Sequence, residues 1–501
     1  MVSKIRFSFL PPVRFLLSVP AFLHTQVMIS PLIAPTPTPV RRGNVKITAI
    51  VLCIAAAFAL AFILKPRGTV DRPSGSAAPT IDDILASIPQ SQGDSASEKG
   101  VIEAVARVRN KPTEPHSWVS LGDTLAQRLR DSSDQTYFEC AEKVYLQALR
   151  LDPKWADAMN GMAWVTGGRH RFPESIEWAN KALKIAPDSA DAHGILGDAA
   201  VEMGDYDLAT DYYQKMMDLR PDLSSWSRGG YLLWLTGDSP KAIQLMEQAI
   251  RAGAPFAENS IWCRAKLATM HLHAGDLSAA AGILEPSLRV QSRNPQILLA
   301  AARLAVASRD FEVAEKYFRM LLEKGPNHDA LVGLGDLRAI KDDKAGAESF
   351  YVQVDALHAA HQASGVHDHV QMAKFLADHD RNLIEALRLA EQHKLTRNVI
   401  EADVLAWVYL KNGDNTRAIE AIKRALAHNT PDAEIHYHAG MIAAAAGDIE
   451  AATRHLQKAI AMNPEFSLLQ ARAARRALEK IGTRETAPTT TSQNKQPEGS
   501  R

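Results

Sequence analysis

Cysteine is scarce in this chain of 501 residues, which has only Cys53, Cys140 and Cys263. They are too few and too far apart for a disulfide framework, a CxxC redox pair, a CxxCH haem site or a four-ligand zinc site. The formal net charge is zero, because 57 Lys and Arg residues balance 57 Asp and Glu residues. Without an overall basic field, a nucleic-acid partner is not expected.

Catalytic signatures are absent as well. The sequence contains no GxxxxGK[ST] phosphate loop, no GxSxG elbow and no HExxH. The pair Gly333-x-Gly335 lacks the third glycine and the preceding strand of a dinucleotide-binding motif. The sequence therefore predicts no enzymatic activity, no cofactor and no small-molecule substrate.

One long apolar run is present, over residues 47–64, in which Thr48 is the only polar side chain. Its eighteen residues reach about the minimum length for a transmembrane helix. Basic residues flank it, and the further Lys and Arg of the tail 1–46 place the N-terminus in the cytoplasm by the positive-inside rule. The run predicts a single membrane span, with the tail poorly ordered and the larger C-terminal part across the membrane.

The segments that flank the body of the chain are poor in apolar residues. Residues 65–110 are largely rich in Pro, Gly and Ser and predict a flexible linker, with a capping helix possible over 98–110. Residues 483–501 have the same character and predict a disordered tail.

A repeat of about 34 residues governs the chain from 111 to 482. Apolar residues three or four apart predict two amphipathic helices in each unit. Glycine followed by Asp, as at Gly204, predicts a left-handed turn between them, and a proline such as Pro221 ends the second helix. A small residue recurs at intervals of 34, 34, 33, 38, 34, 33, 39, 32 and 34, at Ala141, Ser175, Ala209, Ala242, Ala280, Ala314, Ala347, Ala386, Ala418 and Ala452.

This pattern resembles the tetratricopeptide repeat. The resemblance implies an all-α fold, a right-handed α-solenoid of about ten helix hairpins over 111–482, in which each hairpin buries its apolar face against its neighbours. A C-terminal capping helix is expected over 466–481.

In tetratricopeptide-repeat proteins the first helix of each hairpin lines a concave groove. The resemblance implies a groove of aromatic and acidic residues that suits a partner segment with apolar anchors and positive charge. The Lys, Asn and Arg pattern of the carboxylate-clamp subgroup is not found. Packing of each ring between helices is the alternative. The implied groove residues are Trp164, Asp191, Asp198, Glu202, Tyr231, Trp234, Trp262, Asp329, Asp336, Phe375, Trp407 and Tyr437.

Histidines crowd one short stretch, with His358, His361, His367 and His369 within twelve residues. Pairs two or three apart can meet a metal ion, and Asp368 lies between two of them. Solvent-facing histidines on an alanine-rich helix are the preferred interpretation, so no metal site is predicted.

These features together predict a non-enzymatic scaffold or assembly factor that holds a partner protein near a membrane. A chaperone-like receptor for extended or unfolded clients is the alternative. Anchor, linker and repeats resemble the architecture of bacterial inner-membrane tetratricopeptide-repeat proteins that act in cytochrome c or cell-envelope assembly. This resemblance implies a solenoid on the periplasmic side of a bacterial inner membrane.

Overall fold

A computed structural model describes residues 80–485 of the chain, apart from 92, 94, 133, 256, 324, 364–367 and 395. These residues belong to one compact unit, 78–501. The predicted tail 1–46 and membrane span 47–64 lie outside the described residues, and so do residues 486–501 of the predicted disordered tail. Within the described part, no helix combines the length and the apolar character needed to cross a bilayer.

The described residues form 23 α-helices, α2 to α24, one short 3-10 helix, η1 (Glu391–His393), and no strand. Ten helix hairpins follow one another, as the repeat predicts. Their first helices are α4 (Pro115–Ser132), α6 (Ala156–Gly168), α8 (Ala190–Glu202), α10 (Leu223–Leu235), α12 (Glu258–His273), α14 (Pro295–Ala307), α16 (His328–Ala339), α18 (His369–Asp378), α20 (Val399–Lys411) and α22 (Ala433–Ala445). Their second helices are α5 (Thr136–Leu151), α7 (Phe172–Ile185), α9 (Tyr206–Leu219), α11 (Ser239–Ala252), α13 (Leu277–Val290), α15 (Phe311–Leu322), α17 (Lys344–Ala363), α19 (Leu383–Ala390), α21 (Asn415–Ala425) and α23 (Ile449–Met462).

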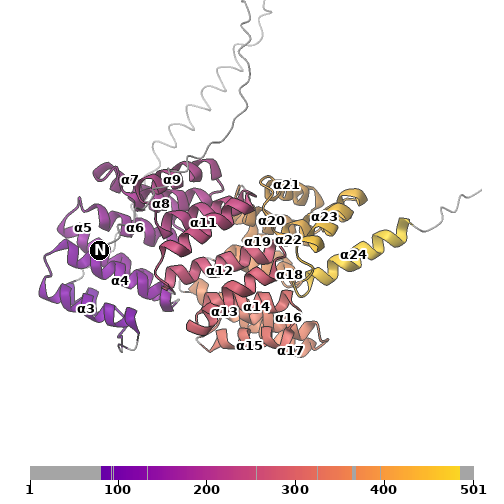
Figure 1. Cartoon of the computed structure of the whole chain (residues 1–501), viewed down its shortest axis with the longest axis horizontal. Helices are drawn as coiled ribbons and strands as arrows, with labels where there is room; N and C mark the ends of the chain where they lie inside the picture. Colours follow the sequence, from indigo (N-terminus) through magenta and orange to yellow (C-terminus); the bar gives the residue numbers. More distant parts are fainter. Residues whose placement is uncertain are drawn as a thin grey trace, which may run out of the picture. The chain divides into compact units, whose positions relative to one another are not determined.

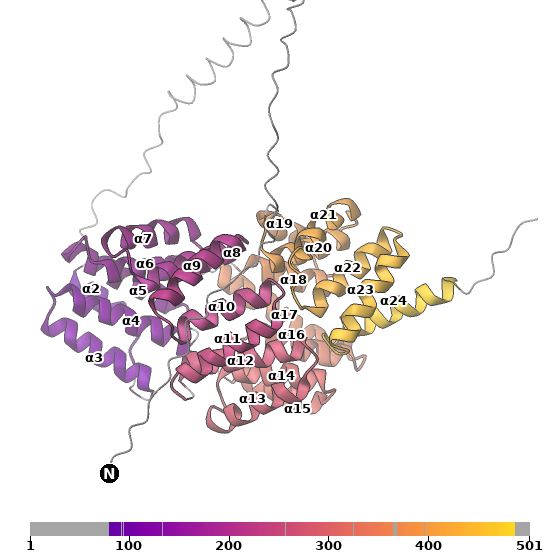
Figure 2. The ribbon, with the colours of Figure 1, turned by 45° about the horizontal axis from the view of Figure 1, so that its top comes forward.

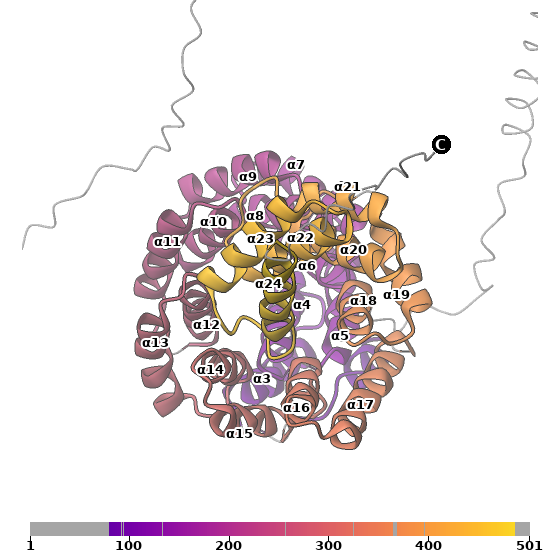
Figure 3. The same cartoon turned by 90° about the vertical axis from the view of Figure 1, so that its right-hand side faces the viewer.

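The stacked hairpins wind into a superhelix. Viewed along its axis, the first helices of the middle hairpins face inward and the second helices form the outer ring (Figure 3). The recurring small residue sits at the contact between the two helices of a hairpin, where Ala141, Ala209, Ala242 and Ala314 are fully buried. The inner surface is thus built from one helix of every hairpin, which is the expected groove.

The turn between the two helices of a hairpin uses a left-handed residue. Five glycines followed by Asp have φ between 71° and 87°, at Gly204, Gly237, Gly275, Gly413 and Gly447. Four other hairpins place a non-glycine residue at the corresponding position with φ of 53° to 62°, at His170, Arg309, Asp342 and Asp380. The Asp after each glycine accepts a hydrogen bond from the backbone of the second helix and caps it.

Successive turns of the superhelix contact each other through residues that are about 195 positions, or six hairpins, apart in the sequence. The backbone N–H of Val399 donates to the hydroxyl of Tyr206 at 2.9 Å, and the Asn398 amide donates to the carbonyl of Val201 at 3.3 Å. One hairpin further along, the Thr430 hydroxyl donates to the carbonyl of Leu235. Figures 1 and 2 show the corresponding helices, α8 to α11 and α19 to α22, in adjacent turns. We call this contact the inter-turn seam.

The N-terminal cap begins earlier than expected. Helices α2 (Ile81–Ala86) and α3 (Ala96–Asn110) both precede the first hairpin. Part of the predicted flexible linker is therefore ordered, because Ile88 follows Ile84 and Leu85 by four and three residues and all three are buried against α3 to α5.

The C-terminal cap is shifted. Its helix, α24, spans Gln470–Glu485 rather than 466–481, and it projects from the end of the solenoid (Figure 2). The preceding residues 463–469 form no helix of their own but cross the groove, where Leu468 joins the apolar cluster of α14 to α16. The helix also extends to residue 485, into the first residues of the predicted disordered tail.

Candidate partner-binding groove

All twelve predicted groove residues lie on the first helix of a hairpin, and Asp329 and Asp336 line a cavity in the groove. Four of the aromatic residues are nevertheless buried, with exposed fractions of 7% for Trp234, 2% for Phe375, 4% for Trp407 and 3% for Tyr437. The Trp407 ring stacks on His438, with ring centroids 4.4 Å apart. For these four rings, packing between helices replaces the expected exposure to a partner.

Three aromatic side chains remain partly exposed in the groove: Trp164, Tyr231 and Trp262. The Lys266 ammonium lies 5.2 Å from the ring centroid of Tyr231 and 5.5 Å from that of Trp262. Burial, together with repulsion from Arg303, lowers the pKa of Lys266 to about 8. This stretch of the groove therefore already holds a cation against its aromatic faces.

Four of the five predicted acidic groove residues have a partner within the protein: three bind an arginine, and the fourth, Asp336, binds a tyrosine. Asp191 binds Arg220, Asp198 binds Arg228 at 2.8 Å, and Asp329 binds Arg303 at 3.2 Å. Each arginine lies 26 to 30 residues away in sequence, on or beside an adjacent hairpin. The three carboxylates therefore already have a cationic partner within the protein.

Asp336 and Asp198 also belong to a structural motif that recurs along the chain. A Gly-Asp pair in the first helix meets a tyrosine of the second, whose hydroxyl donates to the Asp: Tyr213 to Asp198 and Tyr351 to Asp336, both at 2.7 Å. The glycine is required, because a Cβ on Gly197 would come within 2.3 Å of the Tyr213 ring. Tyr145 and Asp123 repeat the arrangement at 2.8 Å. The recurrence of Gly-Asp and a later Tyr in the sequence is the signal that reveals this bond.

Glu202 differs from the other four. It is the last residue of α8, and its carboxylate forms no ion pair or hydrogen bond with any described residue. Solvent reaches the side chain, but the concave wall around it raises the pKa to about 7, chiefly by desolvation and then by repulsion from Glu401 and Asp198. An acidic group held in this way is stabilised by any cation that enters the groove.

A hollow of about 320 Å³ lies beside Glu202. Its lining includes the Trp164 and Phe172 rings, His170, Asp198 and Glu202. The lining therefore combines aromatic rings with a carboxylate that has no partner among the described residues. A Lys or Arg side chain, with an apolar stem and a cationic head, matches both features.

A second cavity, of about 440 Å³, lies further along the groove between α12, α14, α16 and α18. The Lys374 ammonium binds Asp378 and Glu434, each at 2.6 Å, at its wall. Residues 463–470 of the protein's own chain line the same cavity, where the Gln470 amide donates to Asp378 at 2.6 Å. The repeat pattern predicts only a capping helix at this end of the chain and gives no signal for a segment that lines the groove.

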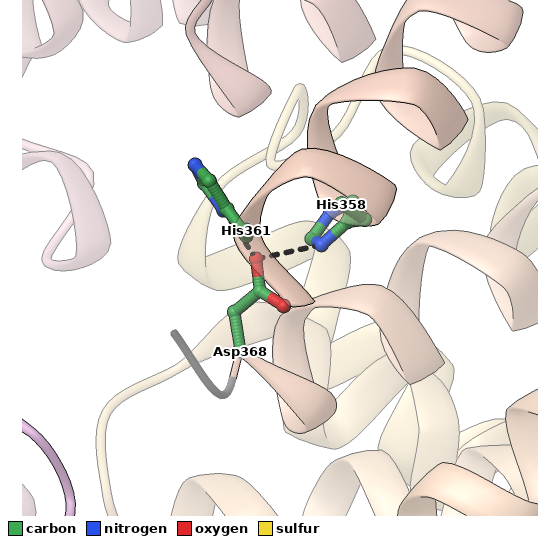
Figure 4. Close-up of side chains that lie close together, drawn as sticks. All are labelled: His358, His361 and Asp368. Atoms are coloured by element: carbon green, nitrogen blue, oxygen red, sulfur yellow. Dashed lines mark hydrogen bonds and ion pairs between the residues drawn. The ribbon is translucent and has the colours of Figure 1, made fainter. Parts of the chain in front are cut away.

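The histidine stretch is not a solvent-facing surface. His358 is 6% exposed, and its ring lies with His361 around the carboxylate of Asp368 (Figure 4). His367 lies outside the described residues. Burial of His358 corrects the expectation that these side chains project from an alanine-rich helix into water.

Comparisons with known proteins agree with the repeat architecture. The sequence profile of the tetratricopeptide repeat family matches residues 195–258, 299–361 and 404–465. A search of curated protein sequences found no match.

Among solved structures, Pseudomonas aeruginosa PilF is 22% identical, with 42% of this chain and 93% of that chain covered and a TM-score of 0.35. A human IFIT1 dimer with m7Gppp-AAAA is 16% identical, with 62% and 72% covered and a TM-score of 0.44. Yeast Tom70 is 12% identical, with 78% and 96% covered and a TM-score of 0.34. Scores this low carry no conclusion about a shared partner. The chain therefore carries tetratricopeptide repeats in these three segments, within a described part that is built from ten stacked helix hairpins.

Proposed function

We propose that this protein is a non-enzymatic scaffold that binds a partner protein through the concave groove of its solenoid. The observation that carries the proposal is the hollow lined by both Trp164 and Glu202, the latter an acidic group without a cationic partner among the described residues. The partner segment that fits this hollow presents a Lys or Arg beside apolar residues.

The apolar run 47–64 supports a second part of the proposal, namely that the scaffold is tethered to a membrane. The further Lys and Arg residues of the tail 1–46 favour a solenoid on the far side of that membrane from the N-terminus, which in a bacterium is the periplasm. In that position, membrane proteins and cell-envelope proteins are the partners with direct access to the scaffold. A reporter fused after Arg501 tests the topology: activity of a periplasmic reporter supports it, and activity of a cytoplasmic reporter contradicts it.

A receptor for extended client polypeptides is the second candidate function. It is favoured by residues 463–469, since a stretch of chain made of turns, without a helix of its own, already lines a cavity of the groove. A client receptor binds isolated extended peptides at micromolar concentration, whereas a scaffold requires the folded partner. Titration of the full-length protein with short basic peptides separates the two functions.

Crosslinked pull-down from native membranes tests the scaffold itself. Trp164→Ala and Glu202→Lys are expected to deplete the partner, because they remove the aromatic wall and reverse the charge of the hollow. Ile185→Ala is the matched control, since Ile185 is 48% exposed on an outer helix. A partner retained by both groove variants, or lost in the control, contradicts binding through the groove.

A further inference from the structure

We propose that His358, His361 and Asp368 form a binding site for a divalent transition-metal ion, with zinc as the best-fitting ion. The three potential ligand atoms lie within 4.8 Å of one another. The Nδ1 atoms of His358 and His361 lie 2.6 Å and 2.8 Å from the same carboxylate oxygen of Asp368 (Figure 4). Two imidazoles and one carboxylate are ligands that zinc prefers, and they leave a fourth position for water or a partner's side chain.

The Nδ1 atom of His358 is a second indication that a ligand binds here. It is buried and has no hydrogen-bond partner of acceptable geometry, although the carboxylate oxygen of Asp368 is within contact distance. A buried nitrogen of this kind costs free energy unless something occupies it. A metal ion bound between Nδ1 and the carboxylate satisfies both groups.

The other nitrogen of His358 has the partner that a metal ligand requires. Its Nε2 lies 2.9 Å from Nδ1 of His328, on the neighbouring helix α16. When Nδ1 binds a metal, Nε2 carries the proton and donates a hydrogen bond to Nδ1 of His328, which fixes the tautomer and the orientation of the His358 ring.

Asp368 is also placed for this role rather than for helix capping. It is the N-cap residue of α18, yet its side chain accepts no capping hydrogen bond. The N-cap Asp residues of α9, α11, α13 and α15 all accept one. The Asp368 carboxylate is instead turned toward the two histidines.

An irregularity of the repeat supplies the two histidines. The interval from Ala347 to Ala386 is 39 residues instead of 34. Helix α17 has 20 residues, whereas α11 and α13 have 14 each, and its additional turns carry His358 and His361 three residues apart. The bound ion would join this extension to the start of α18 and stabilise the junction of the seventh and eighth hairpins.

A second trio, Asp378, Glu434 and His438, does not support the same proposal. The Lys374 ammonium lies 2.6 Å from both carboxylates and already supplies the positive charge. The second trio is therefore already neutralised by Lys374 and carries no metal proposal.

Isothermal titration of the chelator-treated full-length protein with Zn²⁺ tests the proposal. About one ion is expected to bind per chain, and His361→Ala and Asp368→Asn are each expected to weaken binding at least about tenfold. His116→Ala, a substitution of an exposed histidine on α4, is the control and is expected to bind as the wild type. Absence of zinc binding, unchanged binding in both site variants, or equal loss in the control overturns the site.

X-ray absorption spectroscopy of the zinc-loaded wild type gives a test that does not depend on the folding of any variant. Two imidazole nitrogens with additional oxygen ligands are expected. A sulfur shell, or a shell without imidazole, overturns the assignment.

Discussion

Gly204 lies directly against the backbone of Arg397, six hairpins away, so that a Cβ on Gly204 would come within 2.1 Å of the Arg397 carbonyl carbon. The same glycine has φ of 71° in the turn between α8 and α9. One residue therefore satisfies two requirements: the left-handed turn within a hairpin and the close approach of two superhelical turns. The second requirement makes the inter-turn seam sensitive to a single methyl group.

Gly204→Ala is expected to destabilise the solenoid more than Gly447→Ala does. Gly447 has φ of 82° but open space around it, so alanine there costs about 1–2 kcal/mol of backbone strain. Alanine at 204 adds the steric clash at the seam, for a total of about 3 kcal/mol or more. Urea unfolding followed by far-UV circular dichroism gives the comparison. Equal costs for the two variants would show that the turns do not touch at Gly204.

Tyr206→Phe is expected to open the seam locally. The Tyr206 hydroxyl accepts from the Val399 N–H, and its removal leaves that buried donor unpaired at a cost of about 1–3 kcal/mol. Hydrogen exchange of the first turn of α20 should accelerate. Tyr212→Phe, in the same helix as Tyr206, is the control and should leave this exchange unchanged.

Glu202→Gln is expected to stabilise the protein above pH 7 and to have little effect near pH 4.5. The carboxyl titrates at about 7 in the folded protein and near 4.5 in the unfolded chain. The folded state therefore holds the proton more tightly, and its stability falls as the pH rises from 4.5 to 7.

Glutamine resembles the protonated carboxyl and avoids that loss of stability. The melting temperature of the Glu202→Gln variant should therefore exceed that of the wild type by about 1–2 °C at pH 8. The shift is modest because solvent screens the exposed carboxylate. Thermal melts of both proteins at pH 4.5 and pH 8 measure the difference. A lower melting temperature of Glu202→Gln at pH 8 would mean that the carboxylate has a cationic partner.

The period of the sequence was sufficient to predict the ten hairpins and the turns at Gly204 and Gly447, because each hairpin repeats the same local requirements. It was not sufficient to predict the inter-turn seam, since Tyr206 and Val399 are 193 residues apart and lie in different repeats. The fate of the groove charges was missed for a similar reason. Whether Asp198 is free or paired depends on Arg228 in the next hairpin, and only the superhelical geometry brings the two together.

The aromatic residues show the same limit. Both Trp164 and Trp407 lie on first helices, yet only the ring of Trp164 lines a hollow, whereas Trp407 is covered by His438. Helical periodicity places a residue on a face but does not say what the adjacent hairpin lays over it.

Site-specific photocrosslinking in cells is the sharpest test of partner binding in the groove. A photoreactive phenylalanine analogue in place of Trp164 lies inside the hollow, and the same analogue at Val290, which is 56% exposed on outer helix α13, lies outside the groove. The account predicts a discrete crosslinked partner from position 164, lost when Glu202→Lys is added, and none from position 290. Crosslinks from position 290 alone, or crosslinks from 164 that persist with Glu202→Lys, would contradict it.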